Sequence, residues 1–268
     1  MNPHAKRWIT GIIAVPVVFA VVFFGNALIF AGLIALLLLG GSLEYHRMVF
    51  GGGRPFERAE GLAAALFLPL SSFLGGLTLL TASAVFLFTA LFLLYLFRAG
   101  EVLPDMADLM KVTFGVVYLP FLFSHAVLIR GLDGGTAWIF FIVVLAFSGD
   151  ISAFYVGRTW GRRKLMPNVS GGKTVEGTLG LMAGSILGCL VFRYAFLPGV
   201  SVSDTVLLAF LGSILCQLGD LFESAIKRSA DVKDSGVLFP GHGGVLDRLD
   251  SLILMVPFVY YYIILVIR

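Results

Sequence analysis

Long runs of apolar residues dominate this chain, and polar residues gather in the short segments that separate them. A run of about 20 predominantly apolar residues is long enough to cross a membrane as a helix. The narrowest separations between runs are at Gly25-Asn26 and near Thr81. We therefore predict an all-α fold, a polytopic membrane helix bundle of about nine transmembrane helices. The predicted spans are roughly residues 9–24, 27–43, 62–80, 82–97, 112–129, 137–157, 178–196, 205–222 and 252–267.

The composition of the chain also indicates a membrane protein. Hydrophobic residues make up 59% of the 268 residues and charged residues only 13%, about half the charged share of a typical soluble domain. The net charge of +3 comes without a basic stripe of interleaved aromatic residues, so we exclude nucleic acid as a partner. Cys189 and Cys216 lie inside apolar runs without CxxC spacing, which is typical of buried thiols.

The distribution of loop charge predicts the orientation of the bundle. No internal repeat or Pro/Ser-rich linker divides the chain, so we expect a single membrane domain over residues 1–268. Residues 1–130 would supply the N-terminal spans, and residues 137–268 the other spans and the cytoplasmic loops of an active site. With the N-terminus in the cytoplasm, the inside segments hold all but three of the 19 Lys and Arg residues. Because cytoplasmic loops are rich in Lys and Arg, we expect the N-terminus in the cytoplasm and the C-terminus outside.

Charged residues concentrate in the segment 224–250 and in the residues just before it. Asp220 and Glu223 lie three residues apart, which places both carboxylates on one face of a helix. Asp247 and Asp250 repeat that spacing at the start of the last predicted span. Several carboxylate oxygens that converge in this way can bind a hard divalent cation.

Other roles for some of these carboxylates stay open. Asp150 falls inside a predicted span, where an ionised carboxylate needs a cation or water, so we treat it as a site candidate. Glu223 could instead form an ion pair with Lys227 or Arg228 at the end of a helix. Asp250 could instead stabilise a helix N-terminus, because acids favour that position.

A glycine-rich loop at 239–244 separates the two pairs of acids. Glycines such as Gly243 and Gly244 let backbone N–H groups approach an anion closely. His242 and Lys233 add positive charge nearby. We predict that this loop cradles a phosphate.

A second polar loop, at 170–177, contains the run Gly-Gly-Lys-Thr and follows a basic segment. It is not a Walker A loop, because Pro167 stands where that motif requires its first glycine. We expect it to supply Lys173 to a phosphate group.

These motifs together resemble the phosphatidate cytidylyltransferases, also called CDP-diacylglycerol synthases. The segment 224–250 reads Ser-x-x-Lys-Arg-x(4)-Lys-Asp-Ser-Gly-x(3)-Pro-Gly-His-Gly-Gly-x-x-Asp-Arg-x-Asp, and it is similar to the signature of that family. The blocks at 150–158 and 170–177 also resemble the family, whereas the first half of the chain matches only in hydropathy. Gly171 departs from the pattern, since the family usually has proline there.

The resemblance implies transfer of a cytidylyl group from CTP to phosphatidic acid, which gives CDP-diacylglycerol and pyrophosphate and requires Mg²⁺. The two substrates and the surrounding membrane lipids would be the partners, and a second cation and a homo-oligomer stay open. We also expect a multi-pass protein of the inner cell membrane, with the active site facing the cytoplasm, because the charged loops fall in the predicted cytoplasmic segments. Metal ions and fixed cations would neutralise the two anions that have to meet.

Each candidate residue has an expected role in that chemistry. The predicted metal ligands are Asp220 and Asp247 as the principal pair, followed by Asp150, Glu223 and Asp250. The predicted catalytic residues are Asp220, Asp247, Lys227 and Arg248. The predicted substrate-binding residues are Lys173, Ser224, Arg228, Lys233, His242, Gly243 and Gly244.

Two other functions fit part of the pattern. A cation-coupled membrane transporter could use carboxylates inside the membrane to bind its ion. A CTP-dependent lipid kinase of the dolichol kinase type would use a similar nucleotide site, but it would transfer the γ-phosphoryl group and release CDP. The unbroken motif from Lys233 to Asp250 favours the cytidylyltransferase.

Overall fold

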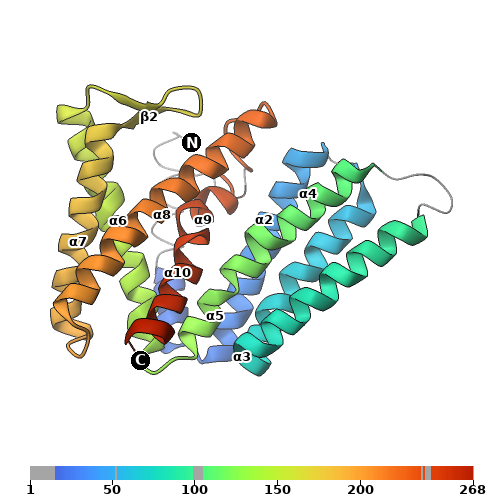
Figure 1. Ribbon diagram of the computed structural model, residues 1–268, viewed down its shortest axis with the longest axis horizontal. Coiled ribbons are helices and arrows are strands. Elements are labelled where there is room, and N and C mark those ends of the chain that lie inside the picture. The colour runs from blue at the N-terminus through green and yellow to red at the C-terminus, as the bar shows by residue number, and fades with distance from the viewer. Residues whose placement is uncertain (1–15, 52, 99–104, 237, 239–242, 268) are drawn as a thin grey trace. The chain divides into compact units, whose positions relative to one another are not determined.

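The computed structural model describes residues 16–51, 53–98, 105–236, 238 and 243–267 (Figure 1). Contacts within the chain divide it into two compact units. The first unit comprises Met1–Leu132 with Asp234–Arg248, and the second comprises Asp133–Lys233 with Leu249–Arg268. Each unit is described on its own.

The described part of the first unit is mainly helical, and its residues 234–236, 238 and 243–245 are not in helices. Residues 16–24 are helical, residues 25 and 26 are not, and α2 follows. The Asn26 side chain caps α2, because its Oδ1 accepts a hydrogen bond from the backbone N–H of Ile29 at 2.9 Å. The helices of this unit are α2 (Ala27–Phe50), α3 (Pro55–Arg98), α4 (Met106–Val116), the π-helix η1 (Val117–Phe121) and α5 (His125–Arg130).

The α3 segment is a helical hairpin rather than one straight helix. Gly75 and Gly76 leave the helical conformation, and Gly76 has φ +63°, which glycine adopts without steric strain. The chain then runs back along itself (Figure 1), so that Arg98 at the end of α3 meets acids from its first turns. The Arg98 guanidinium lies 3.0 Å from the Glu57 carboxylate and 2.7 Å from the Glu60 carboxylate. These ion pairs hold the open ends of the two arms together.

The second unit contains long helices and one small sheet. Its strands pair in antiparallel fashion, with Lys164 opposite Thr174 and Met166 opposite Ser170. This hairpin lies at the end of α6 and α7 (Figure 1). Its elements are α6 (Gly135–Trp160), β1 (Lys164–Met166), β2 (Ser170–Thr174), α7 (Val175–Phe196) and α8 (Val202–Ser229), and the chain ends with α9 (Leu246–Ile253), α10 (Met255–Tyr262) and η2 (Ile263–Ile267).

Small residues bring α6 and α7 into close contact. A Cβ atom added at Gly184 of α7 would overlap the side chain of Ser152 on α6, and one at Gly188 would overlap Ser148. The Ser185 hydroxyl donates a hydrogen bond to the Leu145 carbonyl across the same contact, at 2.8 Å. Small side chains allow helix backbones to approach closely in this way. The contact fixes the α7 N-terminus, and hence strand β2, against α6.

The predicted all-helical membrane class is confirmed, with the β1–β2 hairpin as its exception among the described residues. Seven helices in the described part of the chain are long and apolar enough to cross a membrane, so the predicted count of nine is not confirmed. The break at Gly25-Asn26 lies where we predicted it. The division near Thr81 was placed wrongly, because the chain turns at Gly75 and Gly76 and Thr81 lies in the second arm of α3.

Close packing at Gly184 predicts that even a methyl group destabilises this unit. We expect Gly184→Ala to lower the free energy of unfolding by about 1–3 kcal/mol, the usual effect of overpacking. The matched control is Gly199→Ala, since nothing lies within 4 Å of a Cβ atom there. Thermal unfolding of both variants in detergent measures the difference. Equal unfolding temperatures for the two variants would contradict close packing of α6 on α7.

Candidate active site

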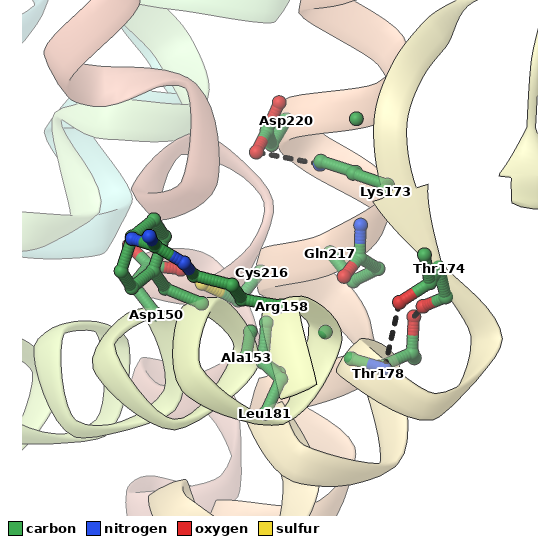
Figure 2. A pocket seen from close by; sticks show the side chains of 14 residues that line it. Asp150, Ala153, Arg158, Lys173, Thr174, Thr178, Leu181, Cys216, Gln217 and Asp220 are labelled. Atoms are coloured by element: carbon green, nitrogen blue, oxygen red, sulfur yellow. Dashed lines mark hydrogen bonds and ion pairs between the residues drawn. The ribbon is translucent and has the colours of Figure 1, made fainter. Parts of the chain in front are cut away.

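A cavity of about 300 Å³ lies in the second unit, among α6, β2, α7 and α8 (Figure 2). Small and apolar side chains such as those of Ala153 and Leu181 form part of its wall. The charged and amide side chains that line it are those of Asp150, Arg158, Lys173, Gln217 and Asp220. The cavity therefore combines both signs of charge with an apolar wall, as ligand sites usually do.

An ion pair between Lys173 of β2 and Asp220 of α8 crosses this cavity (Figure 2). The Lys173 Nζ lies 2.5 Å from the Asp220 Oδ2, and the two side chains are 20% and 36% exposed. The Ser224 hydroxyl contacts the other carboxylate oxygen of Asp220 at 3.4 Å. The Asp220 side chain is partly open to solvent, whereas the Lys173 Nζ is buried and, apart from this ion pair, has no hydrogen-bond partner among the described residues.

The hairpin that carries Lys173 is tied to the start of α7. The Glu176 carboxylate accepts hydrogen bonds from the backbone N–H groups of Arg162 and Arg163, at 3.0 and 3.2 Å from its Oε2. Thr174 caps α7, because its Oγ1 accepts from the N–H of Gly177 at 3.1 Å. Lys173 therefore precedes a capped helix start and cannot move far without breaking these bonds.

Three carboxylates of this unit act electrostatically on the Cys216 thiol. Asp150 of α6, Asp220 of α8 and Asp250 of α9 are all close enough to act on Cys216 electrostatically. Among the described residues, no group of three or more His, Cys, Asp or Glu side chains is arranged to hold a metal ion. Mg²⁺ in proteins is usually held by one or two carboxylates together with water and substrate phosphates. Asp150 and Asp220, which both line the cavity, fit that donor set.

The amide of Gln217 is a buried polar group of the cavity wall. Gln217 is 8% exposed and lies one helical turn before Asp220. Its Nε2 has no hydrogen-bond partner in the described part of the chain. An unsatisfied buried donor is unfavourable, so a ligand that offers an acceptor would be stabilised there. The sequence analysis did not single out this residue.

Glu223 and Lys227 form a buried ion pair on α8, with 2.5 Å between Oε2 and Nζ. Glu223 is 0% exposed. This is the alternative pairing that the sequence left open for Glu223, so the charge of Lys227 is already neutralised. Arg228 donates to the Val232 carbonyl at 2.9 Å just after the end of α8, and Lys233 is exposed.

In the first unit, the Asp247 carboxylate organises the loop that precedes α9. Its Oδ2 accepts hydrogen bonds from the N–H of Ser235 at 3.0 Å, the Ser235 hydroxyl at 2.9 Å and the N–H of Gly244 at 2.7 Å. Gly243 has φ +83° beside the same carboxylate. The Gly244 N–H that we predicted for a phosphate is therefore donated to Asp247. His242 lies outside the described residues, and Arg248 is exposed in the first turn of α9.

Glu44 of α2 is a further buried acid beside this loop, and the sequence analysis missed it. It is 5% exposed, and its carboxylate accepts from the N–H groups of Val245 and Leu246, each at 2.9 Å. The available signal was an acid directly after the second apolar run. Nothing local connects that acid with partners about 200 positions further along the chain.

The predicted site residues thus fall in both units. Lys173, Asp220 and Asp150 come together at the cavity, and the Glu223–Lys227 pair follows on α8. Asp250 lies in the second turn of α9, and Asp247 is the acid in its first turn. The predicted residues of the second unit are Asp150, Lys173, Asp220, Glu223, Ser224, Lys227, Arg228, Lys233 and Asp250, and those described in the first unit are Gly243, Gly244, Asp247 and Arg248.

The family profile and the named relatives of this chain point to the same protein family. The profile of the "Cytidylyltransferase family" matches residues 5–266. The chain is 40% identical over 151 residues to a phosphatidate cytidylyltransferase of Bacillus subtilis, covering 56% of each chain. It is 38% identical over 157 residues to the uncharacterized protein YnbB of Escherichia coli, covering 57% of this chain and 52% of that one. It is also 32% identical over 290 residues to a phosphatidate cytidylyltransferase of Synechocystis sp., covering 98% of this chain and 97% of that one. The matches thus span about half the length of the first two relatives and nearly all of the third.

Proposed function

Because the chain belongs to the cytidylyltransferase family, we propose that it transfers the cytidylyl group of CTP to phosphatidic acid, forming CDP-diacylglycerol and pyrophosphate. Two relatives named phosphatidate cytidylyltransferase support this substrate pair. The observation that carries the proposal is the cavity in which Lys173 faces Asp220. A cation and a carboxylate side by side suit a ligand that brings both phosphate and a metal ion.

In the proposed reaction, a phosphate oxygen of phosphatidic acid attacks the α-phosphorus of CTP. A new P–O bond forms there, the bond from the α-phosphorus to the bridging oxygen of the β-phosphate breaks, and pyrophosphate leaves with that electron pair. The acceptor phosphate is already ionised at neutral pH, so no side-chain nucleophile is needed. Lys173 and Arg158 neutralise charge on the phosphates, and the apolar wall of the cavity limits access of water.

Mg²⁺ fits the carboxylates of the cavity, with Asp220 and Asp150 as the proposed ligands and Asp250 near them. When bound, the ion would act as a Lewis acid that withdraws charge from the triphosphate. Asp247 stays a predicted ligand, although three donors already engage its Oδ2. Asp220 would then bind the cation, and the Lys173 ammonium would exchange its ion pair with Asp220 for one with the phosphates.

The position of the protein in the cell is also part of the proposal. We place it in the inner cell membrane with the β1–β2 hairpin and the cavity facing the cytoplasm, where CTP is available. The excess of Lys and Arg in the predicted inside segments supports this orientation. Phosphatidic acid and the surrounding lipids would reach the cavity from the bilayer.

The identity of the transferred group tests the proposed activity. Purified protein with phosphatidic acid and Mg²⁺ should place label from [α-³²P]CTP in a CDP-lipid and label from [γ-³²P]CTP in pyrophosphate. Transfer of γ-label to a lipid, with release of CDP, would instead identify a lipid kinase. No label in lipid, together with substrate-gated ion flux in vesicles, would identify a transporter.

Removal of the Asp220 charge should stop turnover without unfolding the protein. Asp220→Asn is nearly isosteric but lacks an anionic oxygen, so we expect kcat to fall at least about a hundredfold, as for loss of a key electrostatic group. Asp133→Asn is the matched control, because Asp133 is exposed and precedes α6 at the end remote in sequence from the hairpin. Initial rates over a range of Mg²⁺ concentrations measure the effect. Near-normal turnover of Asp220→Asn would remove this residue from the metal site.

Selective thiol labelling tests the proposed orientation. In a background lacking Cys189 and Cys216, a cysteine at exposed Gly171 should react with a membrane-impermeant reagent only from the cytoplasmic side. A cysteine at exposed Gly199, at the other end of α7, should react only from the outside. Reversed labelling of the two positions would overturn the orientation, and labelling of both from one side would show that α7 does not cross the membrane.

A further inference from the structure

The Glu44 carboxylate accepts hydrogen bonds from residues in the loop between α8 and α9 and at the start of α9. Its Oε1 accepts the Val245 N–H at 2.9 Å, and its Oε2 accepts the Leu246 N–H at 2.9 Å and the Ser235 hydroxyl at 3.0 Å. These donors come from both ends of the loop, whereas Glu44 lies on α2. All belong to the first unit. One carboxylate therefore joins the two ends of the loop to a transmembrane helix.

The loop is also shaped to fit that carboxylate closely. A Cβ atom added at Gly236 or at Gly244 would overlap the carboxylate of Glu44. Neither glycine has a positive φ, so steric contact with Glu44, rather than backbone conformation, explains why a side chain does not fit there. Two of the glycines in the segment 224–250 thus leave room for Glu44.

We propose that Glu44 is a positioning residue for the reaction, which holds the loop so that Asp247 and Arg248 keep their orientation. This inference rests on the proposed cytidylyltransferase activity. Glu44 acts through the same Ser235 that binds Asp247, because the Ser235 hydroxyl contacts both carboxylates. The negative charge of Glu44 at the first residue of α9 also stabilises the start of the helix that carries Arg248.

The hydrogen bonds of Glu44 argue against direct contact with substrate. Both of its oxygens accept backbone or hydroxyl hydrogens within the protein, and its side chain is buried. Hydrogen bonds from neutral donors to a carboxylate are stronger than those to a neutral amide. Loss of the charge should therefore disturb the loop even where the shape of the side chain is kept.

The first test is Glu44→Gln, which keeps the shape but puts an NH₂ donor where an acceptor is needed. We expect kcat to fall at least about tenfold, as for loss of a charge-assisted hydrogen bond, with both substrate KM values within about twofold of wild type. A lower kcat with nearly unchanged KM values indicates a group that supports the transition state rather than substrate binding. The matched control is Glu60→Gln, which removes an ion pair of the α3 hairpin and should retain kcat.

The second test varies the loop and leaves Glu44 in place. Gly236→Ala should lower kcat as Glu44→Gln does, because the methyl group pushes the loop away from the carboxylate. In a Glu44→Ala background the carboxylate is absent, so Gly236→Ala should have little further effect. This non-additivity is the mark of two residues that act through one contact.

The outcomes separate this inference from the proposed function. A wild-type protein that forms no CDP-lipid would refute the proposed function itself. If the wild type is active, a Glu44→Gln variant with kcat within about twofold of wild type overturns the positioning role. The positioning role is also overturned if kcat falls as far in Glu60→Gln as in Glu44→Gln, or if Glu44→Gln changes only KM. Additive effects of Gly236→Ala and Glu44→Ala on kcat would overturn it as well.

Discussion

The structure depends on one constraint, the high cost of placing a charge in an apolar medium without a partner. Glu223 is fully buried on α8 and pairs with Lys227 one turn later. Glu44 is buried on α2 and accepts backbone N–H groups at the start of α9. Breaking a buried pair leaves an uncompensated charge, so the Glu223–Lys227 pair stabilises α8 itself, whereas Glu44 joins α2 to the start of α9.

An ion pair also lies in the cavity, where a ligand can reach it. Lys173 and Asp220 are partly exposed, and both line a space of about 300 Å³. Their ion pair can exchange for a phosphate on one side and a cation on the other, because a ligand that supplies both charges leaves neither group unpaired. The two charges that line the cavity thus stay available to a ligand. The tight α6–α7 contact keeps the hairpin with Lys173 in place.

Much of the fold could be predicted from hydropathy, and the exceptions have local reasons. The helix break at Gly25-Asn26 was predicted because polar and small residues interrupt the apolar run there. The turn at Gly75 and Gly76 was missed because apolar residues continue on both sides of it. The non-helical backbone of Gly75 and Gly76, with the positive φ of Gly76 that favours glycine, reveals the turn.

The candidate site was predictable where its residues carry charge inside an apolar run or in a polar loop, and not elsewhere. Asp150, Lys173 and Asp220 were found from charge and spacing, and they line one cavity. Glu44 and Gln217 were missed, because the donors to Glu44 lie about 200 positions away and a lone Gln in an apolar run gives no signal until its burial is known.

We propose that the cavity around Lys173 binds the nucleotide, and ligand-induced stabilisation tests this binding without turnover. Excess CTP with Mg²⁺ should raise the unfolding temperature of the wild type, because a ligand that binds only the folded state stabilises it. The control variant is Lys111→Ala, which removes a lysine of α4 that pairs with Asp108, and we expect the same rise in its unfolding temperature. We expect a much smaller rise for Lys173→Ala. An equal rise in Lys173→Ala, or no rise in the wild type, would contradict the account.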